Sequence, residues 1–193
     1  MKPTSIFSLL FFAPYAAFAN DATSSYTGFY AGIGVGQGEI EDPYYELRRR
    51  DGLPTGWGGE HNDTSNLISL ALGHNWKNDN LILGLEARIQ KRDFNDHSFQ
   101  IDNTGNVDTD NFTTYESDLS KQLVFKIGTL LDAKNHVYLS IGRVETDYTR
   151  TYTTTLLGGA SDSIKSSEYG NIFGVGYETF ISDSLSIRGE INR

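Results

Sequence analysis

Apolar residues recur at every second position in seven segments of this chain of 193 residues, and this period limits the possible folds more than any other feature. Successive residues of a β-strand point to opposite sides, so the alternation predicts strands with one apolar and one polar face. We therefore predict an all-β protein. The predicted strands lie at about residues 26–36, 68–76, 81–90, 122–128, 137–142, 173–178 and 185–191.

The connections between these segments alternate in length. Tight turns, rich in Asn, Asp and Ser, are predicted at residues 77–80, 132–135 and 182–184. Long polar loops without clear periodicity are predicted at about residues 37–65, 94–117 and 150–168. An antiparallel up-and-down meander with this pattern has all its tight turns at one end and all its long loops at the other.

Two details of strand pairing follow from the same alternation. Across the first tight turn we expect Trp76 to pair with Leu81 and Gly73 to pair with Gly84. Near Gly142 the apolar positions change phase. This change indicates either a β-bulge at that point or the end of the apolar band.

The polar face of the strands is unusually rich in glycine. Glycines on this face weaken a strand that faces water, but inside a narrow barrel they leave room for larger side chains across the lumen. The glycines are Gly32, Gly34, Gly36, Gly73, Gly84, Gly128, Gly142, Gly174 and Gly176. The larger residues on the same face carry three positive and three negative charges, which can pair with one another when buried. The predicted interior polar network consists of Glu86, Arg88, Lys126, Glu178, Arg188 and Glu190. Within it, Glu178 is expected to lie opposite or diagonal to Arg188.

The apolar face carries no charge across the predicted band. A sheet of this kind can bury the apolar face, as a soluble lipocalin-like carrier does, or turn it toward lipid. The glycines and balanced charges on the polar face favour the second solution, a transmembrane antiparallel up-and-down β-barrel. Trp76, Tyr30 and Tyr177 are then candidates for the aromatic girdles at the membrane interfaces.

The first 19 residues have the pattern of an export signal rather than of a strand. Lys2 supplies a positive start, residues 6–19 are apolar, and an A-x-A cleavage site ends at Ala19, directly before Asn20. The barrel domain is therefore predicted to span residues 20–193. No later run is long enough for a membrane-spanning helix, which excludes a helical membrane protein.

Composition excludes several kinds of chemistry. The chain has no cysteine, and its formal charge of −9 gives no electrostatic footprint for nucleic acid. The four histidines lack metal-binding spacing, and the acidic residues around Asp102 and Asp108 lack the order of a calcium loop. No catalytic residues, cofactor or metal ligands are predicted, so the protein is predicted not to be an enzyme. Residues 48–50, three arginines, could contact lipopolysaccharide phosphates, but a solvated loop neutralised by nearby acids is the favoured interpretation.

Four short motifs carry a family resemblance. They are Gly28–Gly36, Gly73–Trp76 followed by Leu83–Glu86, Gly174–Glu178, and Leu185–Glu190. Together they resemble the porin-like small outer-membrane β-barrel family of Gram-negative bacteria, related in shape to the OmpA transmembrane domain and OmpX.

The resemblance implies an eight-stranded monomeric barrel in the cell outer membrane. Its short turns would face the periplasm and its long loops the outside, and its partners would be outer-membrane lipid, lipopolysaccharide and the assembly machinery. Members of the family usually end in an eighth strand with a terminal aromatic residue, whereas this sequence stops at Arg193 within the seventh segment. Eight strands are therefore expected with seven visible, and the last strand is expected to be missing.

The function predicted from these features is structural or interactive. A barrel with a largely packed lumen would display long surface loops to the environment, as a surface antigen does. The first alternative is a narrow porin-like channel for small solutes. The second alternative is a secreted lipocalin-like ligand carrier.

Overall fold

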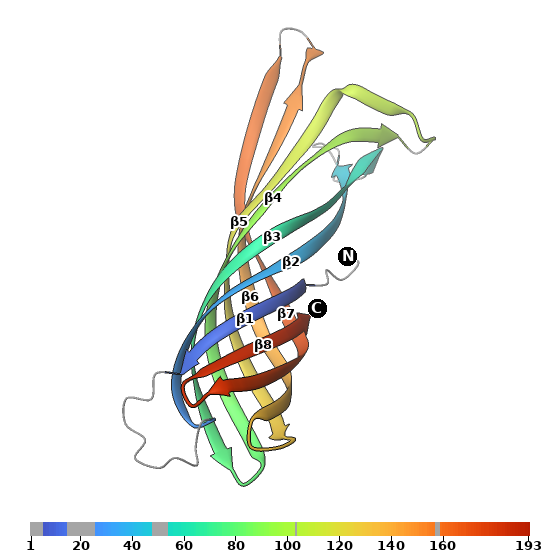
Figure 1. Cartoon of the computed structure of the whole chain (residues 1–193). Helices are drawn as coiled ribbons and strands as arrows, with labels where there is room; N and C mark the ends of the chain where they lie inside the picture. Colours follow the sequence, from blue (N-terminus) through green and yellow to red (C-terminus); the bar gives the residue numbers. More distant parts are fainter. Residues whose placement is uncertain (1–5, 15–25, 48–53, 103, 157–158) are drawn as a thin grey trace.

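The computed structural model describes residues 6–14, 26–47, 54–102, 104–156 and 159–193, which lie almost entirely in strands. Each strand is antiparallel to its neighbours in chain order, and the first also pairs with the last, so the strands close into a barrel (Figure 1). The predicted fold class is confirmed. The strands are β1 (Ile6–Pro14), β2 (Gly28–Leu47), β3 (Pro54–Asn78), β4 (Leu81–Asp102), β5 (Val107–Leu130), β6 (Asn135–Thr154), β7 (Ala160–Ser182) and β8 (Leu185–Asn192). In the described part of the chain, no helix is long and apolar enough to cross a membrane.

The two faces of the sheet are distributed as the alternation predicts. Large apolar side chains cover the outer face, and Phe29, Leu72 and Phe173 expose 73%, 66% and 57% of their surface. Charged and polar side chains fill the inner face, where Arg88 and Arg188 are buried. A soluble barrel has the opposite arrangement, so the alternative of a lipocalin-like carrier is not supported.

The first tight turn is shorter than predicted. It contains only Asp79 and Asn80, and the positive φ of 53° at Asp79 allows the chain to reverse within two residues. Trp76 consequently pairs with Leu83 rather than with Leu81, and Gly73 pairs with Glu86 rather than with Gly84. The predicted register was wrong by two residues. A shift of two keeps every side chain on its face, which is why the inward and outward assignments still hold.

The segments predicted to be long loops are strands for most of their length. β3, β5 and β7 have 25, 24 and 23 residues, more than twice the 9 to 11 that a membrane-spanning strand needs. Figure 1 shows the β4–β5 and β6–β7 hairpins extending well beyond the barrel at the end opposite the tight turns. Cross-strand hydrogen bonds hold these extensions, such as Thr151 to Ser163 at 2.9 Å and Tyr152 to Asn111 at 2.8 Å. Polar residues are frequent on both faces of the extensions, so these segments lack the apolar period that identified the other strands.

The change of phase near Gly142 marks the end of the apolar band. The pairing of β6 with β7 continues without a shift through Gly142 and Val144, so no bulge is present there. The irregularities on this side of the barrel lie elsewhere, between Lys91 and Phe94 on β4 and between Ser117 and Ser120 on β5.

Strand β1 lies between β2 and β8 and pairs with both. In the sequence its residues have the pattern of an export signal, and an eighth strand was expected beyond Arg193, whereas here Ile6–Pro14 supply that strand. Without β1, the facing edges of β2 and β8 would each carry unpaired N–H and C=O groups. The predicted cleavage site at Ala19 and Asn20 lies outside the described residues.

Candidate functional site: the polar lumen

The structure places all six residues of the predicted interior network inside the barrel. Each exposes at most 6% of its surface, although they come from four different strands. The period-two geometry of each strand directs them inward. They are Glu86 and Arg88 on β4, Lys126 on β5, Glu178 on β7, and Arg188 and Glu190 on β8.

Glu86 is the centre of the network. Its Oε1 accepts hydrogen bonds from Arg88 Nη2 at 2.6 Å and from Arg188 Nη2 at 3.0 Å. Its Oε2 accepts from Arg188 Nη1 at 2.8 Å, from the Tyr30 hydroxyl at 2.8 Å and from Lys126 Nζ at 3.1 Å. One fully buried carboxylate therefore joins side chains of β2, β4, β5 and β8 across the lumen.

Glu190 forms a second centre beside the first. It accepts hydrogen bonds from Arg88 Nη2 at 3.0 Å, from Asn192 Nδ2 at 2.6 Å and from the Tyr138 hydroxyl at 2.5 Å. Arg88 bridges the two carboxylates, since its Nη2 bonds to both Glu86 and Glu190. Buried charges are tolerated when they are paired and hydrogen-bonded in this way.

Glu178 occupies a different position in the network. It pairs directly with Arg188 in the β7–β8 register, as predicted from the sequence, and its Oε1 accepts a hydrogen bond from Ser186 at 2.6 Å. The three cations of the six residues are thus matched by three carboxylates, of which Glu86 and Glu190 hold most of the hydrogen bonds.

Two tyrosines belong to the site and were not predicted there. Tyr30 was expected at the membrane interface, but it lies inside, 7% exposed, with its hydroxyl bonded to Glu86 and Lys126. Its place on the strand gives the signal, because it shares the inward parity of Gly32 and Gly34. Tyr138 is buried in the same way on β6. The other two girdle candidates face outward, with exposures of 51% for Trp76 and 45% for Tyr177.

Glycines on the wall make room for these rings. A Cβ atom added at Gly73 would overlap the ring of Tyr30, and one added at Gly176 would overlap the ring of Tyr138. The ammonium group of Lys126 lies 4.7 Å from the centre of the Tyr30 ring and 5.5 Å from that of Tyr138. The glycine-rich polar face is therefore a closely packed interior.

Apolar side chains close the lumen at the end with the tight turns. Tyr26, Ile82 and Phe180 form a buried cluster there, with Leu130 packed against it. The rings of Tyr26 and Phe180 meet edge to face at 4.5 Å. Water and ions entering the network from this end would have to pass through that cluster.

Hydrogen bonds to Asp102 hold the polar tip of the β4–β5 hairpin. The Asp102 carboxylate accepts hydrogen bonds from the Thr104 and Asn106 backbone N–H groups, both at 2.8 Å, and from their side chains. These bonds hold the pKa of Asp102 well below the usual range of an aspartate. Among the described residues, no group of three or more His, Asp and Glu side chains is arranged to hold a metal ion.

Comparison with protein families identifies the fold of this chain. A family model described as "Outer membrane protein beta-barrel domain" matches residues 5–193. The chain belongs to this family. The structure of this outer-membrane barrel is also similar to that of a major outer membrane protein from Thermus thermophilus. The TM-score is 0.48 at 11% sequence identity, and the match covers 98% of this chain and 99% of that chain. No curated protein matches the chain.

Membership of the family agrees with the predicted resemblance and with the apolar outer face of the barrel. The predicted cleavage after Ala19 and the absence of enzymatic activity are not tested by these findings and stay predictions. The polar network in the lumen of this outer-membrane barrel connects opposite walls through ion pairs and hydrogen bonds.

Proposed function

We propose that the protein is a non-conducting outer-membrane barrel that displays long hairpins outside the cell and contributes to the integrity of the envelope. In this orientation the tight turns face the periplasm and the β2–β3, β4–β5 and β6–β7 hairpins face outward. The observation that carries the proposal is the polar network centred on Glu86, whose hydrogen bonds cross the lumen between β2, β4, β5 and β8.

The packing above and below the network supports the same function. Tyr26, Ile82 and Phe180 close the periplasmic end. Toward the hairpins, the side chains of Leu67 and Phe94 are buried on the inner face of the barrel, with exposures of 1% and 2%. A permeating ion would have to break ion pairs in the middle and pass apolar side chains at both ends.

The hairpins support a display function. The described strands of the β4–β5 and β6–β7 hairpins continue the barrel ladder, so a hydrogen-bonded sheet extends away from the membrane. The exposed side chains of the β6–β7 hairpin include Ile164 at 65% and Tyr169 at 74%. Loops positioned on a rigid scaffold are common sites of recognition, and these hairpins give an outside molecule a long edge to contact.

Single-channel recording on the full-length protein in a planar lipid bilayer tests the proposal. We expect no resolved conductance steps from the wild type. The double variant Glu86→Ala/Arg188→Ala removes one negative and one positive charge from the centre and is expected to produce steps. Glu145→Ala/Lys165→Ala removes the same charges from the outside of the barrel and is the matched control. Heat-modifiable mobility on gels checks that each variant is folded.

A narrow channel for small solutes is the second candidate. The observation that favours it is the polar lining, which continues above the network through Gln90, Gln122 and Ser120, all buried on the inner wall. Conductance steps from the folded wild type would replace the first proposal with this one.

A further inference from the structure

A groove of about 840 Å³ crosses the outer face of the barrel over strands β2 to β5, and Leu185 of β8 also lines it. Its floor follows one row of cross-strand neighbours, in which Leu72 of β3 pairs with Ala31 of β2 on one side and with Ala87 of β4 on the other. The two alanines are smaller than the outward residues on either side along their strands, so the surface is recessed at their positions. The groove therefore has an apolar floor against which a hydrocarbon chain can pack.

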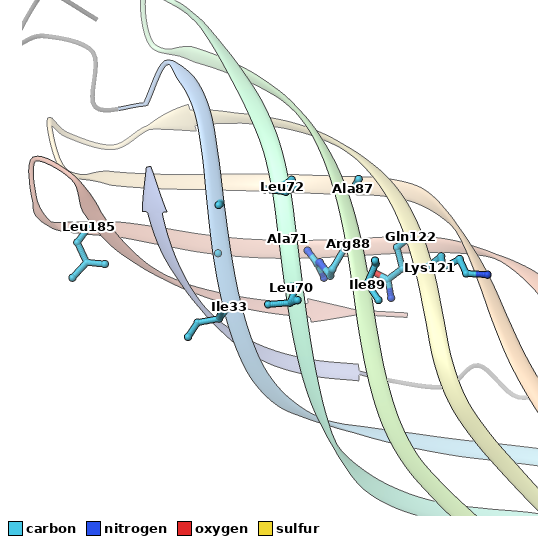
Figure 2. Close-up of a pocket in the computed structure, with 12 residues that line it drawn as sticks. Ile33, Leu70, Ala71, Leu72, Ala87, Arg88, Ile89, Lys121, Gln122 and Leu185 are labelled. Carbon is cyan, nitrogen blue, oxygen red and sulfur yellow. The ribbon is translucent and has the colours of Figure 1, made fainter. Parts of the chain in front are cut away.

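One wall of the groove is the neighbouring row of outward residues. Ile33 pairs with Leu70, Leu70 pairs with Ile89, and Ile89 pairs with Lys121. Figure 2 shows Leu70, Ile89 and Lys121 following one another from strand to strand, with the lysine at the far end. Of the described outward-facing residues that line the groove, Lys121 alone is charged.

Lys121 is one of three cations that mark the upper edge of the apolar band. On β4, β5 and β6 the first charged outward residue after the band is Lys91, Lys121 and Arg143. The residue of β5 that pairs with Lys91 is Leu119, and the residue of β6 that pairs with Lys121 is Glu145. Lys121 therefore lies two residues closer to the periplasmic end than the partner of Lys91, and Arg143 lies two residues closer than the partner of Lys121. Strands of a membrane barrel are tilted, and a line in the membrane plane crosses them with such steps. The cations therefore lie at one depth, the headgroup level of the outer leaflet.

The printed contacts of Lys121 and Arg143 leave both side chains able to bind an anion. Lys121 Nζ lies 3.5 Å from the Asp147 carboxylate, and both side chains are about half exposed. Exposed pairs of this kind are weak, so a phosphate can compete with Asp147 for the ammonium group. Arg143 Nη1 donates to Asn171 Oδ1 at 2.6 Å, which uses one of the five N–H donors of its guanidinium.

We propose that this surface binds one molecule of lipopolysaccharide, with an acyl chain in the groove over Ala31 and Ala87 and a phosphate of its lipid A on Lys121 and Arg143. The charge of the cations and the apolar groove that ends at one of them fit a lipid that is both acylated and phosphorylated. Guanidinium and ammonium groups are the usual phosphate partners in proteins. The inference uses the orientation given in the proposed function, because only the outer leaflet meets the hairpin side of the band.

Native mass spectrometry of the folded full-length protein in detergent tests the inference. The protein is titrated with diphosphorylated lipid A, with the same lipid after removal of its phosphates, and with phosphatidylglycerol. Lys121→Gln and Arg143→Gln remove the cations one at a time and together, and Ala87→Leu fills the groove without changing the charge. Lys165→Gln, on an exposed part of the β6–β7 hairpin, is the matched control for loss of one positive charge.

We expect one retained lipid A on the wild type, with binding weakened about fivefold by each cation removed and about 25-fold in the double variant. Ala87→Leu is expected to weaken binding of the phosphorylated and the dephosphorylated lipid alike, and Lys165→Gln to leave it unchanged. Binding of the double variant within twofold of the wild type, or equal binding of lipid without phosphates, would overturn the phosphate site. Equal retention of phosphatidylglycerol would show that the occupant is a phospholipid. Because retention is measured in detergent, the outcome does not depend on whether the lumen conducts.

Discussion

Replacing the central carboxylate of the lumen by its neutral isostere, Glu86→Gln, is expected to destabilise the barrel strongly. Glu86 is fully buried and accepts hydrogen bonds from Arg88, Arg188, Tyr30 and Lys126. The amide keeps the volume but removes the charge, so three buried cations are left with Glu190 and Glu178. Removal of one partner from a buried ion pair costs about 3–5 kcal/mol of unfolding free energy. In urea, with a slope of about 2 kcal/mol per molar, the midpoint would fall by roughly 1.5–2.5 M.

The assay is reversible urea unfolding of the barrel in lipid vesicles, followed by tryptophan fluorescence. Trp76 faces outward near the tight-turn end of β3 and reports its transfer from the membrane to water. Glu145→Gln is the matched control, because Glu145 faces outward and its side chain accepts a hydrogen bond from the exposed Tyr169 hydroxyl at 3.2 Å. The control is expected to change the unfolding free energy by less than about 0.5 kcal/mol.

A double variant distinguishes two causes for the expected loss of stability, an imbalance of buried charge and a general loss of packing. Glu86→Gln/Lys126→Met restores the wild-type balance of charge while keeping similar side-chain volumes. If the excess positive charge causes the loss of stability, the double variant is more stable than Glu86→Gln alone. The reason is that replacing both partners of a buried ion pair by neutral side chains costs little unfolding free energy. A double variant less stable than the single one, or a Glu86→Gln variant within about 1 kcal/mol of the wild type, would refute the reasoning.

Two further predictions concern the glycines and the hairpin tip. Gly176→Ala is expected to cost about 1–3 kcal/mol in the same urea assay, because its Cβ would overlap the Tyr138 ring, whereas Gly189→Ala meets nothing within 4 Å and should cost less than about 1 kcal/mol. Equal losses at the two glycines would contradict close packing around Tyr138. At the tip, the hydrogen bonds to Asp102 lower the pKa of its carboxyl group. These bonds therefore contribute fully to the stability of the tip above the usual aspartate pKa of about 3.9, and the contribution is lost as the pH falls through the pKa of the folded state. A carbon-detected NMR titration should therefore give Asp102 a midpoint well below that of an unfolded reference, and Asp102→Asn should speed hydrogen exchange at the Asn106 amide.

The sequence predicted the faces of the strands better than their ends. Side-chain direction depends only on whether a position is odd or even, and this property placed Glu86, Arg88 and Arg188 inside the barrel without knowledge of the register. Register depends on the length of each turn, and a four-residue turn was expected where Asp79 allows a two-residue one. The hairpin extensions were missed because polar side chains on both faces carry no period. Their strand structure instead comes from Thr and Tyr residues with high β-propensity and from the ladder below them.

Tyr30 illustrates a different limit. Tyrosine suits both a membrane interface and a polar interior, because its ring is apolar and its hydroxyl forms hydrogen bonds. The residue type therefore did not decide between the two positions. The strand parity did decide it, since Tyr30 alternates with Phe29 and shares its side with Gly32. Within a barrel strand, parity is the more reliable guide when residue type and position disagree.

The N-terminal segment is where the sequence and the fold make opposing demands on the same residues. As an export signal, residues 6–14 would be removed by cleavage after Ala19, and the mass of the mature protein tests that prediction. As strand β1, the same residues pair with Tyr30–Gly38 of β2 and with Ser186–Asn192 of β8. The two roles exclude each other in one mature molecule, because lipid offers no partner for the N–H and C=O groups that removal of β1 would expose on both edges. A mature barrel that has lost residues 6–14 must therefore fill the place between β2 and β8 with another strand, whereas one that keeps them is closed by β1.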